Sequence, residues 1–332
     1  MNMHLIPDVL ATDVATEPIR KGFGRGLLEA GKRNEHVVAA CADLTESVQM
    51  HLFREAFPER FIEIGIGEQN LVTVGAGLAA AGKIPFVSSY AAFSPGRNWE
   101  QIRTTICLND LPVRVVGGHA GLLTGPDGAT HQMLEDIALM RVLPNMVVIV
   151  PGDSLEAEKA TLALAVDKRP AYLRMARDAT PVFTTAGTPF EIGKAYVLTE
   201  GIDITFVTTG TLTFEALVAA EKLFKQGIDV EVIHCPTVKP LDIKTIRASA
   251  ERTRAVITAE EAQVAGGLGG AVAEALSDDC PVMIRRIGVY DRFGESGEPQ
   301  ELMEHFGLKA KNLILAAHDM MEKKKEREKA WR

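Results

Sequence analysis

The chain has 332 residues, which is enough for about two domains of ordinary size. Hydrophobic residues make up 46% and charged residues 24% of the sequence, a composition typical of globular proteins that fold in water. The formal net charge is −8, and no basic segment interleaves with aromatic residues. This charge pattern argues against a nucleic-acid-binding surface.

The four cysteines are scattered without CxxC spacing, which argues against a disulfide framework or a zinc site and favours a reducing compartment. The first residues lack the pattern of a secretory signal. The longest mildly apolar stretch, 71–82, is too short and too rich in glycine to cross a bilayer. We therefore expect a cytoplasmic protein that has no membrane partner.

Short β-branched runs alternate with longer helical patterns from the N-terminus onward. The predicted strands are 36–40, 60–64, 85–89, 112–116, 146–150 and 171–175. The predicted helices are 15–32, 68–82, 97–108 and 154–166. The strands are continuous apolar runs, as burial on both faces requires, so the pattern indicates a parallel sheet covered by helices on both sides.

Residues 176–193 interrupt this alternation with prolines and threonines and no apolar periodicity. A second alternating series follows. Its predicted strands are 204–210, 229–234, 254–261 and 281–288, and its predicted helices are 212–225, 242–251 and 268–276. We predict an α/β protein of two domains, 1–180 and 195–332, joined by a linker at 181–194. Each domain is expected to be a mostly parallel sheet with helices on both faces.

In open α/β sheets, ligands bind beyond the carboxyl ends of the strands. Polar residues gather after five of the predicted strands, in segments 41–47, 65–70, 89–93, 117–132 and 175–178. Glu68 lies in one of these segments, "GIGEQN", at the start of a helix rich in alanine and glycine. Its carboxyl group could exchange a proton with a ligand, or it could simply complement the helix dipole. The tight packing expected of the small helix residues favours the first interpretation.

The segment 117–132 contains His119, Asp127 and His131 among five glycines. Glycines allow a backbone to turn sharply and to approach a ligand closely. Two histidines and an aspartate could bind a metal, relay protons or hydrogen-bond a polyhydroxylated substrate. The spacing does not match a helical HExxH motif, so we assign no metal site to this chain.

Two further groups of residues could contact a ligand. A guanidinium group matches the geometry of a phosphate, so the candidates for binding an anionic substrate are Arg20, Arg174 and Arg177. Tyr90 and Phe93 lie in "SYAAF" and could form a flat wall for a ring, although aromatic residues at this spacing are often part of a core.

These segments together resemble the transketolase family of thiamine-diphosphate enzymes. The matching pieces are "ADLTES", "IGIGEQNLVTVGAGLAAAGKIPFVSSYAAF", "GHAGLLTGPDGATHQMLEDIALMRVLPNM" and "KPLD". The resemblance spans nearly the whole chain and implies a pyrimidine-binding domain followed by the transketolase C-terminal domain, both of them α/β folds.

The resemblance also implies roles for individual residues. Glu68 is similar to the glutamate that hydrogen-bonds the aminopyrimidine ring of the cofactor, and Phe93 to the aromatic residue that stacks on that ring. The implied cofactor-binding residues are Asp43, Glu68, Tyr90 and Phe93. The implied substrate-binding residues are Arg20, Ser47, His119, Asp127, His131 and Arg177. The implied catalytic residues are Glu68, His119 and His131.

One family motif is missing. The diphosphate-binding half of the family carries a Gly-Asp-Gly segment that holds the divalent metal, and no Gly-Asp-Gly occurs in this sequence. The resemblance therefore implies a split enzyme. A partner polypeptide, the N-terminal transketolase subunit, would hold the diphosphate and Mg²⁺ or Ca²⁺. The active assembly is expected to be a heterotetramer with two copies of each chain.

The expected function is transfer of a two-carbon ketol group from a ketose phosphate to an aldose phosphate, a reaction of the pentose phosphate pathway. Two alternatives use the same cofactor: a 1-deoxyxylulose-5-phosphate synthase-like activity, and the beta subunit of a 2-oxo acid dehydrogenase. A third alternative is a degenerate subunit that only regulates or assembles a complete enzyme.

Overall fold

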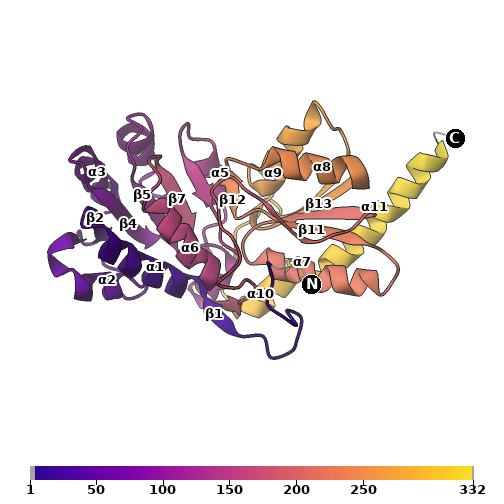
Figure 1. Cartoon of the computed structure of the whole chain (residues 1–332), viewed down its shortest axis with the longest axis horizontal. Coiled ribbons are helices and arrows are strands. Elements are labelled where there is room, and N and C mark those ends of the chain that lie inside the picture. The colour runs from indigo at the N-terminus through magenta and orange to yellow at the C-terminus, as the bar shows by residue number, and fades with distance from the viewer. Residues whose placement is uncertain (1–3, 331–332) are drawn as a thin grey trace.

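A computed structural model describes residues 4–330 of the chain, which form two sheet-based halves side by side (Figure 1). The first half is built on a seven-stranded sheet of order β12-β6-β7-β5-β4-β2-β3. Its strands are β2 (Val37–Cys41), β3 (Phe61–Glu63), β4 (Ile84–Tyr90), β5 (Arg114–Gly118), β6 (Val147–Ile149), β7 (Ala171–Arg174) and β12 (Thr237–Lys239). All neighbouring pairs in it are parallel except β12 with β6.

Helices cover both faces of this sheet. They are α1 (Ile19–Arg33), α2 (His51–Ala56), α3 (Glu68–Ala80), α4 (Trp99–Gln101), α5 (Asp136–Arg141) and α6 (Ser154–Leu164), and α4 continues as a π-helix, Ile102–Cys107. Alternate residues of β2 pack in different clusters. Ala39 lies in a cluster with Phe23 of α1, whereas Ala40 lies in another with Leu71 of α3. Successive side chains of a strand point to opposite faces of the sheet, so an all-apolar strand contributes to the core on both sides.

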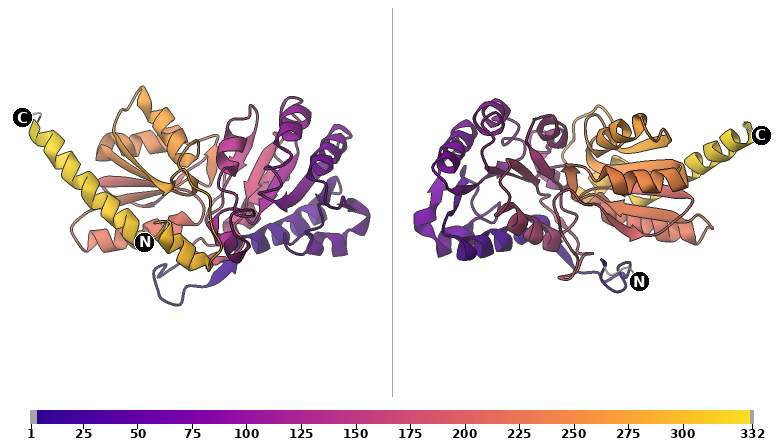
Figure 2. Two further views of the ribbon diagram at one scale, coloured as in Figure 1. Left: turned by 180° about the vertical axis from the view of Figure 1, so that it is seen from behind. Right: turned by 45° about the horizontal axis from the view of Figure 1, so that its top comes forward.

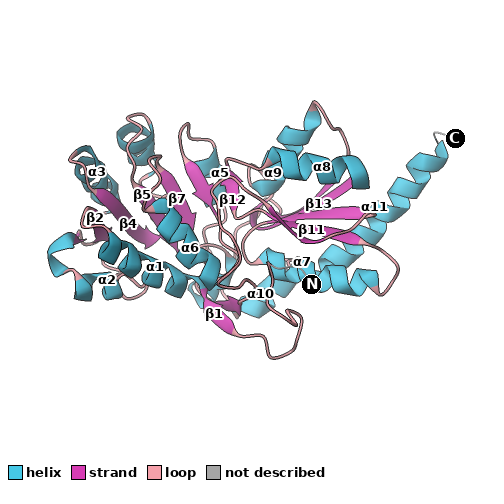
Figure 3. Ribbon diagram, in the orientation of Figure 1, coloured by secondary structure: helices cyan, strands magenta, loops and turns pink. Residues whose placement is uncertain are grey.

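The second half has a five-stranded sheet of order β14-β13-β10-β11-β9. Its strands are β9 (Tyr196–Thr199), β10 (Ile204–Thr208), β11 (Val230–His234), β13 (Ala255–Gln263) and β14 (Met283–Val289), and only β9 is antiparallel to its neighbour. Its helices are α7 (Leu212–Phe224), α8 (Ile243–Thr253), α9 (Leu268–Ser277), α10 (Pro299–His305) and α11 (Ala310–Ala330). Helices α8 and α9 lie on one side of this sheet, and α7 and α11 lie on the other (Figure 3).

The end of α11 projects away from the body of the protein in every view (Figure 2). Most of its last turns are exposed, in agreement with the alternating charges of "EKKKEREK". Across residues 4–330, none of the helices combines the length and the apolar character that a membrane span needs.

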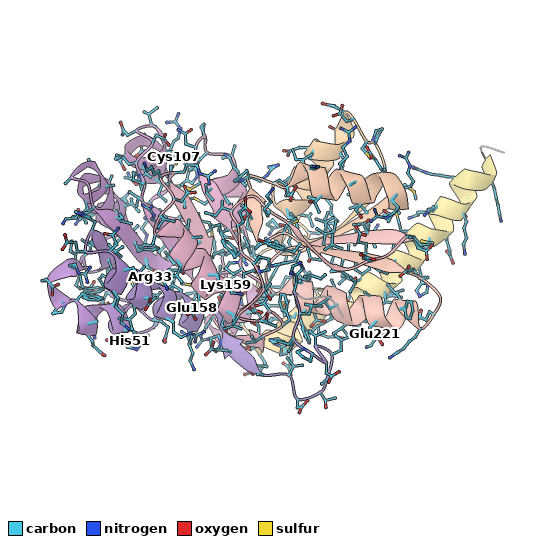
Figure 4. The ribbon with its side chains drawn as sticks, in the orientation of Figure 1. Arg33, His51, Cys107, Glu158, Lys159 and Glu221 are labelled. Atoms are coloured by element: carbon cyan, nitrogen blue, oxygen red, sulfur yellow. The ribbon has the colours of Figure 1, made fainter. Side chains whose placement is uncertain are left out.

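The two halves are joined by more than one covalent connection. The short strand β12 follows β11 of the second half but pairs with β6 of the first sheet. A two-stranded ribbon of β1 (Thr16–Pro18) and β8 (Ala179–Pro181) precedes the irregular segment 182–194. Lys159 of α6, labelled in Figure 4, donates a hydrogen bond from Nζ to the carbonyl oxygen of Thr188 (2.6 Å) and so holds this segment against the first half.

The predicted fold class is confirmed, since both sheets are mostly parallel and covered by helices. Several elements differ from the sequence-based prediction: strands β1, β8 and β9 and helices α2, α5 and α10 were not predicted, and the helix expected at 15–32 begins at Ile19. Two further differences concern the seven-stranded sheet. The strand expected at 112–116 begins at Arg114, two residues further on, because Pro112 has no N–H for the ladder. The pairing of β12 with the first sheet was not expected, because a three-residue strand leaves almost no periodicity to detect.

Candidate active site

The candidate residues gather at one edge of the seven-stranded sheet. Strands β2, β4, β5 and β7 are parallel neighbours, so their carboxyl ends lie side by side. Asp43 and Ser47 follow β2, Tyr90 and Phe93 end or follow β4, His119 follows β5 and Arg177 follows β7. The sheet topology thus brings together residues that are far apart in the sequence.

Glu68 is the first residue of α3 and is only 2% exposed. Its Oε1 lies 3.3 Å from the hydroxyl of Ser89, which donates to it, and its Oε2 lies 3.2 Å from Nη1 of Arg97. Asn98 donates from Nδ2 to the carbonyl oxygen of Glu68 (2.8 Å). A buried carboxylate at a helix N-terminus, held by two side chains while a third holds its backbone, is positioned to hydrogen-bond a ligand.

Four ring side chains form an aromatic group beside Glu68. The ring of Tyr90 stacks on His119, with centroids 3.8 Å apart, and lies 6.1 Å from Phe93. The His131 ring meets Phe93 edge-on at 5.4 Å. Arg97 links this group to Glu68, because its guanidinium also lies over the Phe93 ring. The arrangement provides flat faces for a planar ring.

Two arginines complete the cluster. Nη1 of Arg20 donates to the carbonyl oxygen of Ser47 (2.8 Å) and lies 3.5 Å from Nε2 of His119. Nη1 of Arg177 lies 3.9 Å from a carboxylate oxygen of Asp127. Burial, followed by the positive charge of Arg177, lowers the pKa of Arg20. Since like charges this close repel, an anion between them would offset the repulsion.

His119 is almost fully buried, and its backbone has a φ of +53°. A non-glycine residue in the left-handed region costs free energy, and such residues cluster at functional sites. Burial lowers the pKa of His119 to about 3, and the charges of Arg20 and Arg177 act in the same direction. The ring is therefore neutral at pH 7, where one nitrogen donates and the other accepts.

The depressed pKa of His119 predicts a specific pH dependence of stability. The unfolded chain binds the ring proton near pH 6.5, whereas the folded chain binds it only near pH 3. The neutral ring therefore stabilises the folded chain above pH 6.5, and this stabilisation is lost as the pH falls. Between pH 7.5 and 5.5 the free energy of unfolding should decrease by about 1.4 kcal/mol. Urea unfolding of His119→Asn should lack this loss, while the exposed control His36→Asn should keep it. Equal pH dependence in His119→Asn and wild type would contradict the assignment.

Asp43 stands apart from the other candidates. It is exposed, has a φ of +56°, and its backbone N–H donates to Oε1 of Glu63 (2.8 Å). The other oxygen of Glu63 accepts from the hydroxyl of Thr45 (3.1 Å), and Oε1 also accepts from the N–H of Gly65 (2.9 Å). Glu63 therefore ties together the two loops that carry Asp43 and Glu68.

The sequence-based interpretation missed the residues that hold Glu68 and Asp43 in place, namely Glu63, Ser89, Arg97 and Asn98. Ser89 and Arg97 lie close in sequence to Tyr90 and Phe93. Their position beside the predicted aromatic wall could have indicated that they belong to the site.

The proposal of Arg174 as an anion-binding residue is wrong. Its side chain is 4% exposed, and its Nε donates to Oδ2 of Asp136 (2.8 Å). The hydroxyl of Tyr172 donates to the same oxygen (2.7 Å), and Nη2 of Arg174 donates to the carbonyl oxygen of Glu261 (2.8 Å). This charge is already neutralised inside the protein and is not available to a substrate.

Comparison with known proteins shows to which family the chain belongs. The transketolase pyrimidine-binding domain matches residues 16–182, and the transketolase C-terminal domain matches residues 193–313. The chain belongs to the transketolase family.

Several of its relatives are described as a section or a subunit of a transketolase. The chain is 43% identical to the "Putative transketolase C-terminal section" of Methanocaldococcus jannaschii, over 93% of this chain and 97% of that one. It is 42% identical to the "6-deoxy-6-sulfo-D-fructose transketolase subunit SqwH" of Clostridium sp., over 90% and 92% of the two chains. A solved structure described as "Split gene transketolase, inactive beta4 tetramer" matches with a TM-score of 0.85 and 41% identity, over 93% of this chain and 99% of that one.

The transketolase family uses thiamine diphosphate, and the residues present fit the ring end of that cofactor. Glu68 offers a buried carboxylate, and Tyr90 and Phe93 offer aromatic faces. Nδ1 of His119 is buried without a hydrogen-bond partner in the structure of residues 4–330. Within the same residues, no group of three or more His, Cys, Asp or Glu could hold a metal ion.

Proposed function

We propose that this chain is the C-terminal subunit of a two-chain transketolase that moves a two-carbon ketol group from a ketose phosphate to an aldose phosphate. The observation that carries the proposal is the shared site formed by the buried Glu68, the aromatic group and the two arginines. It brings a buried carboxylate, aromatic faces and a pair of arginines into one cluster, which supports roles for them in proton exchange, ring stacking and anion binding. Thiamine diphosphate, when bound, supplies the carbon nucleophile that carries the two-carbon unit.

The residues of this chain have separate tasks in the proposal. Glu68 hydrogen-bonds the aminopyrimidine ring and holds a proton there, while Phe93 and Tyr90 form the flat wall against it. His119 and His131 orient substrate hydroxyl groups and move protons to and from them. His119 acts as a neutral ring, since its pKa is about 3. Asp43, which follows β2 at the same sheet edge, contacts the cofactor in this proposal.

The anionic end of the sugar is assigned to Arg20, Arg177 and the loop around Ser47, with Asp127 contacting hydroxyl groups. Arg20 and Arg177 are close enough for their charges to interact, which supports a doubly charged group between them. A sulfonate has the same tetrahedral oxygen geometry as a phosphate. The Clostridium relative is named for a sulfosugar, 6-deoxy-6-sulfo-D-fructose. This sulfosugar is therefore the main alternative to a ketose phosphate as the substrate.

We infer that a second polypeptide, the N-terminal transketolase subunit, holds the diphosphate and its Mg²⁺ or Ca²⁺. The lack of Gly-Asp-Gly in the chain supports this division of labour. The description of the related split-gene structure as an inactive beta4 tetramer supports it further. The proposed active form is a heterotetramer of two copies of each chain.

A test mixes the chain with an N-terminal subunit, thiamine diphosphate and Mg²⁺. The donors offered are xylulose 5-phosphate, 6-deoxy-6-sulfo-D-fructose and pyruvate, with ribose 5-phosphate as the acceptor. Ketol transfer from xylulose 5-phosphate is the expected result. Faster transfer from the sulfosugar would identify it, instead of a ketose phosphate, as the donor substrate. Consumption of pyruvate and of neither sugar would favour the synthase or dehydrogenase alternative. Binding without turnover of any donor would favour the regulatory subunit.

A further inference from the structure

The glycine-rich segment 117–132 is held by a carboxylate from the second half of the chain. It contains a short 3₁₀ helix, η3 (Leu122–Asp127), whose first N–H groups have no partner within the helix. Oε1 of Glu261 on β13 accepts a hydrogen bond from the N–H of Leu123 (2.8 Å). Oε2 of Glu261 accepts from the hydroxyl of Thr211 (3.0 Å), which fixes the carboxylate from the other side.

The backbone of the segment is shaped to admit this carboxylate. Gly121 has a φ of +82°, and a Cβ atom there would lie 2.3 Å from Oε1 of Glu261. Any other residue at this position would therefore displace the carboxylate or the loop. Glu261 is itself 3% exposed, so its hydrogen bond to Leu123 is shielded from water.

Two hydrogen bonds connect Leu123 to the proposed substrate contacts through the next residue. The hydroxyl of Thr124 donates to the carbonyl oxygen of His119 (2.7 Å). The carbonyl oxygen of Thr124 accepts from Nη1 of Arg177 (2.7 Å). A shift of Leu123 would move Thr124, and with it both His119 and Arg177.

We propose that Glu261 is a positioning residue through which the second half of the chain fixes the geometry of the substrate loop. The kinetic part of this inference rests on the proposed function, whereas the anchoring of the loop does not. Glu261 touches neither the cofactor nor the sugar in this account. It acts through Leu123 and Thr124.

The preceding residue provides a matched control. Glu260 is also buried on β13, but it faces the start of α9, where it accepts from the N–H groups of Leu268 (2.7 Å) and Gly269 (2.8 Å). Loss of either carboxylate removes a buried helix cap. Only Glu261 contacts the loop.

Hydrogen exchange of the full chain, followed by mass spectrometry on peptides within 119–132, tests the anchoring. Glu261→Ala should speed exchange of this segment by about 10- to 100-fold, because a buried hydrogen bond to a charged acceptor is lost. Glu260→Ala should leave it at the wild-type rate. Unchanged exchange in Glu261→Ala, or equal acceleration in Glu260→Ala, would overturn the proposal.

Kinetics of the two-chain complex test the functional consequence. Glu261→Ala should lower kcat/KM for the donor about tenfold or more, with a raised KM, because the loop residues no longer meet the substrate together. Glu261→Gln should recover most of this loss, since its amide oxygen still accepts from Leu123. Equal losses in Glu260→Ala and Glu261→Ala would reduce Glu261 to a structural role.

If Glu261→Ala does not fold, Thr211→Val releases one oxygen of the carboxylate and should give a smaller acceleration of exchange in the same segment. An unchanged rate in Thr211→Val would then overturn the proposal. If the wild-type complex transfers no ketol group, the proposed function fails, and the exchange measurement still decides whether Glu261 anchors the loop.

Discussion

Glu68→Gln is expected to reduce ketol transfer by the reconstituted two-chain enzyme about 10²- to 10⁴-fold, the usual range for loss of a proton-transferring group. The substitution keeps the shape of the side chain and its hydrogen bonds to Ser89 and Arg97 within reach. It removes the ability to hold an exchangeable proton at the pyrimidine ring. The KM for the sugar phosphates should change much less than kcat, because Glu68 does not contact the sugar in this account.

The matched control is Glu29→Gln. Glu29 also pairs with an arginine, Arg33, at 2.8 Å, but on the outer part of α1 and away from the candidate site. This variant should keep wild-type activity. Near-full transfer by Glu68→Gln would remove Glu68 from the catalytic assignment and would favour the regulatory alternative.

Asp136→Ala is expected to lower the free energy of unfolding by about 3–5 kcal/mol, because it breaks a buried ion pair. Asp136 has no exposed surface and accepts hydrogen bonds from both Tyr172 and Arg174. Its removal takes away the carboxylate that pairs directly with the buried guanidinium of Arg174, and leaves the carboxylate of Glu261, whose charge acts less strongly on that guanidinium. Urea unfolding of the isolated chain measures the change.

An exposed ion pair supplies the comparison for Asp136. Glu251 pairs with Arg247 on α8, where both side chains are at least 40% exposed. Glu251→Ala should change stability by less than about 0.5 kcal/mol, because water screens the pair. A loss below about 1 kcal/mol in Asp136→Ala would show that Arg174 finds water or another partner, contrary to its burial.

The parts of the fold that could be predicted from the sequence are those with a local signal. Strands such as β2 and β10 are short runs that are wholly or mostly apolar, and the helices between them carry long apolar patterns, so their alternation indicated parallel sheets. The edge strand β12 has three residues and depends on pairing with β6, almost 90 positions earlier in the chain. No local pattern records such a pairing.

The candidate site was predictable to a similar extent. Residues at the carboxyl ends of the strands could be selected because the sheet topology places those ends together, and the structure links His119, Tyr90 and Arg20 by direct contacts. The partners of these groups could not be predicted. Asp136 lies 38 positions from Arg174, and Glu261 lies 138 positions from Leu123. Whether an arginine is free to bind a substrate depends on such distant neighbours.

The most direct test of the two-chain transketolase proposal is the transfer assay performed with each chain alone and with both together. Ketol transfer from xylulose 5-phosphate to ribose 5-phosphate is expected only when this chain, an N-terminal subunit, thiamine diphosphate and a divalent metal are all present. Full activity of this chain without a partner, or a complete mixture that consumes pyruvate but transfers no ketol group, would contradict it.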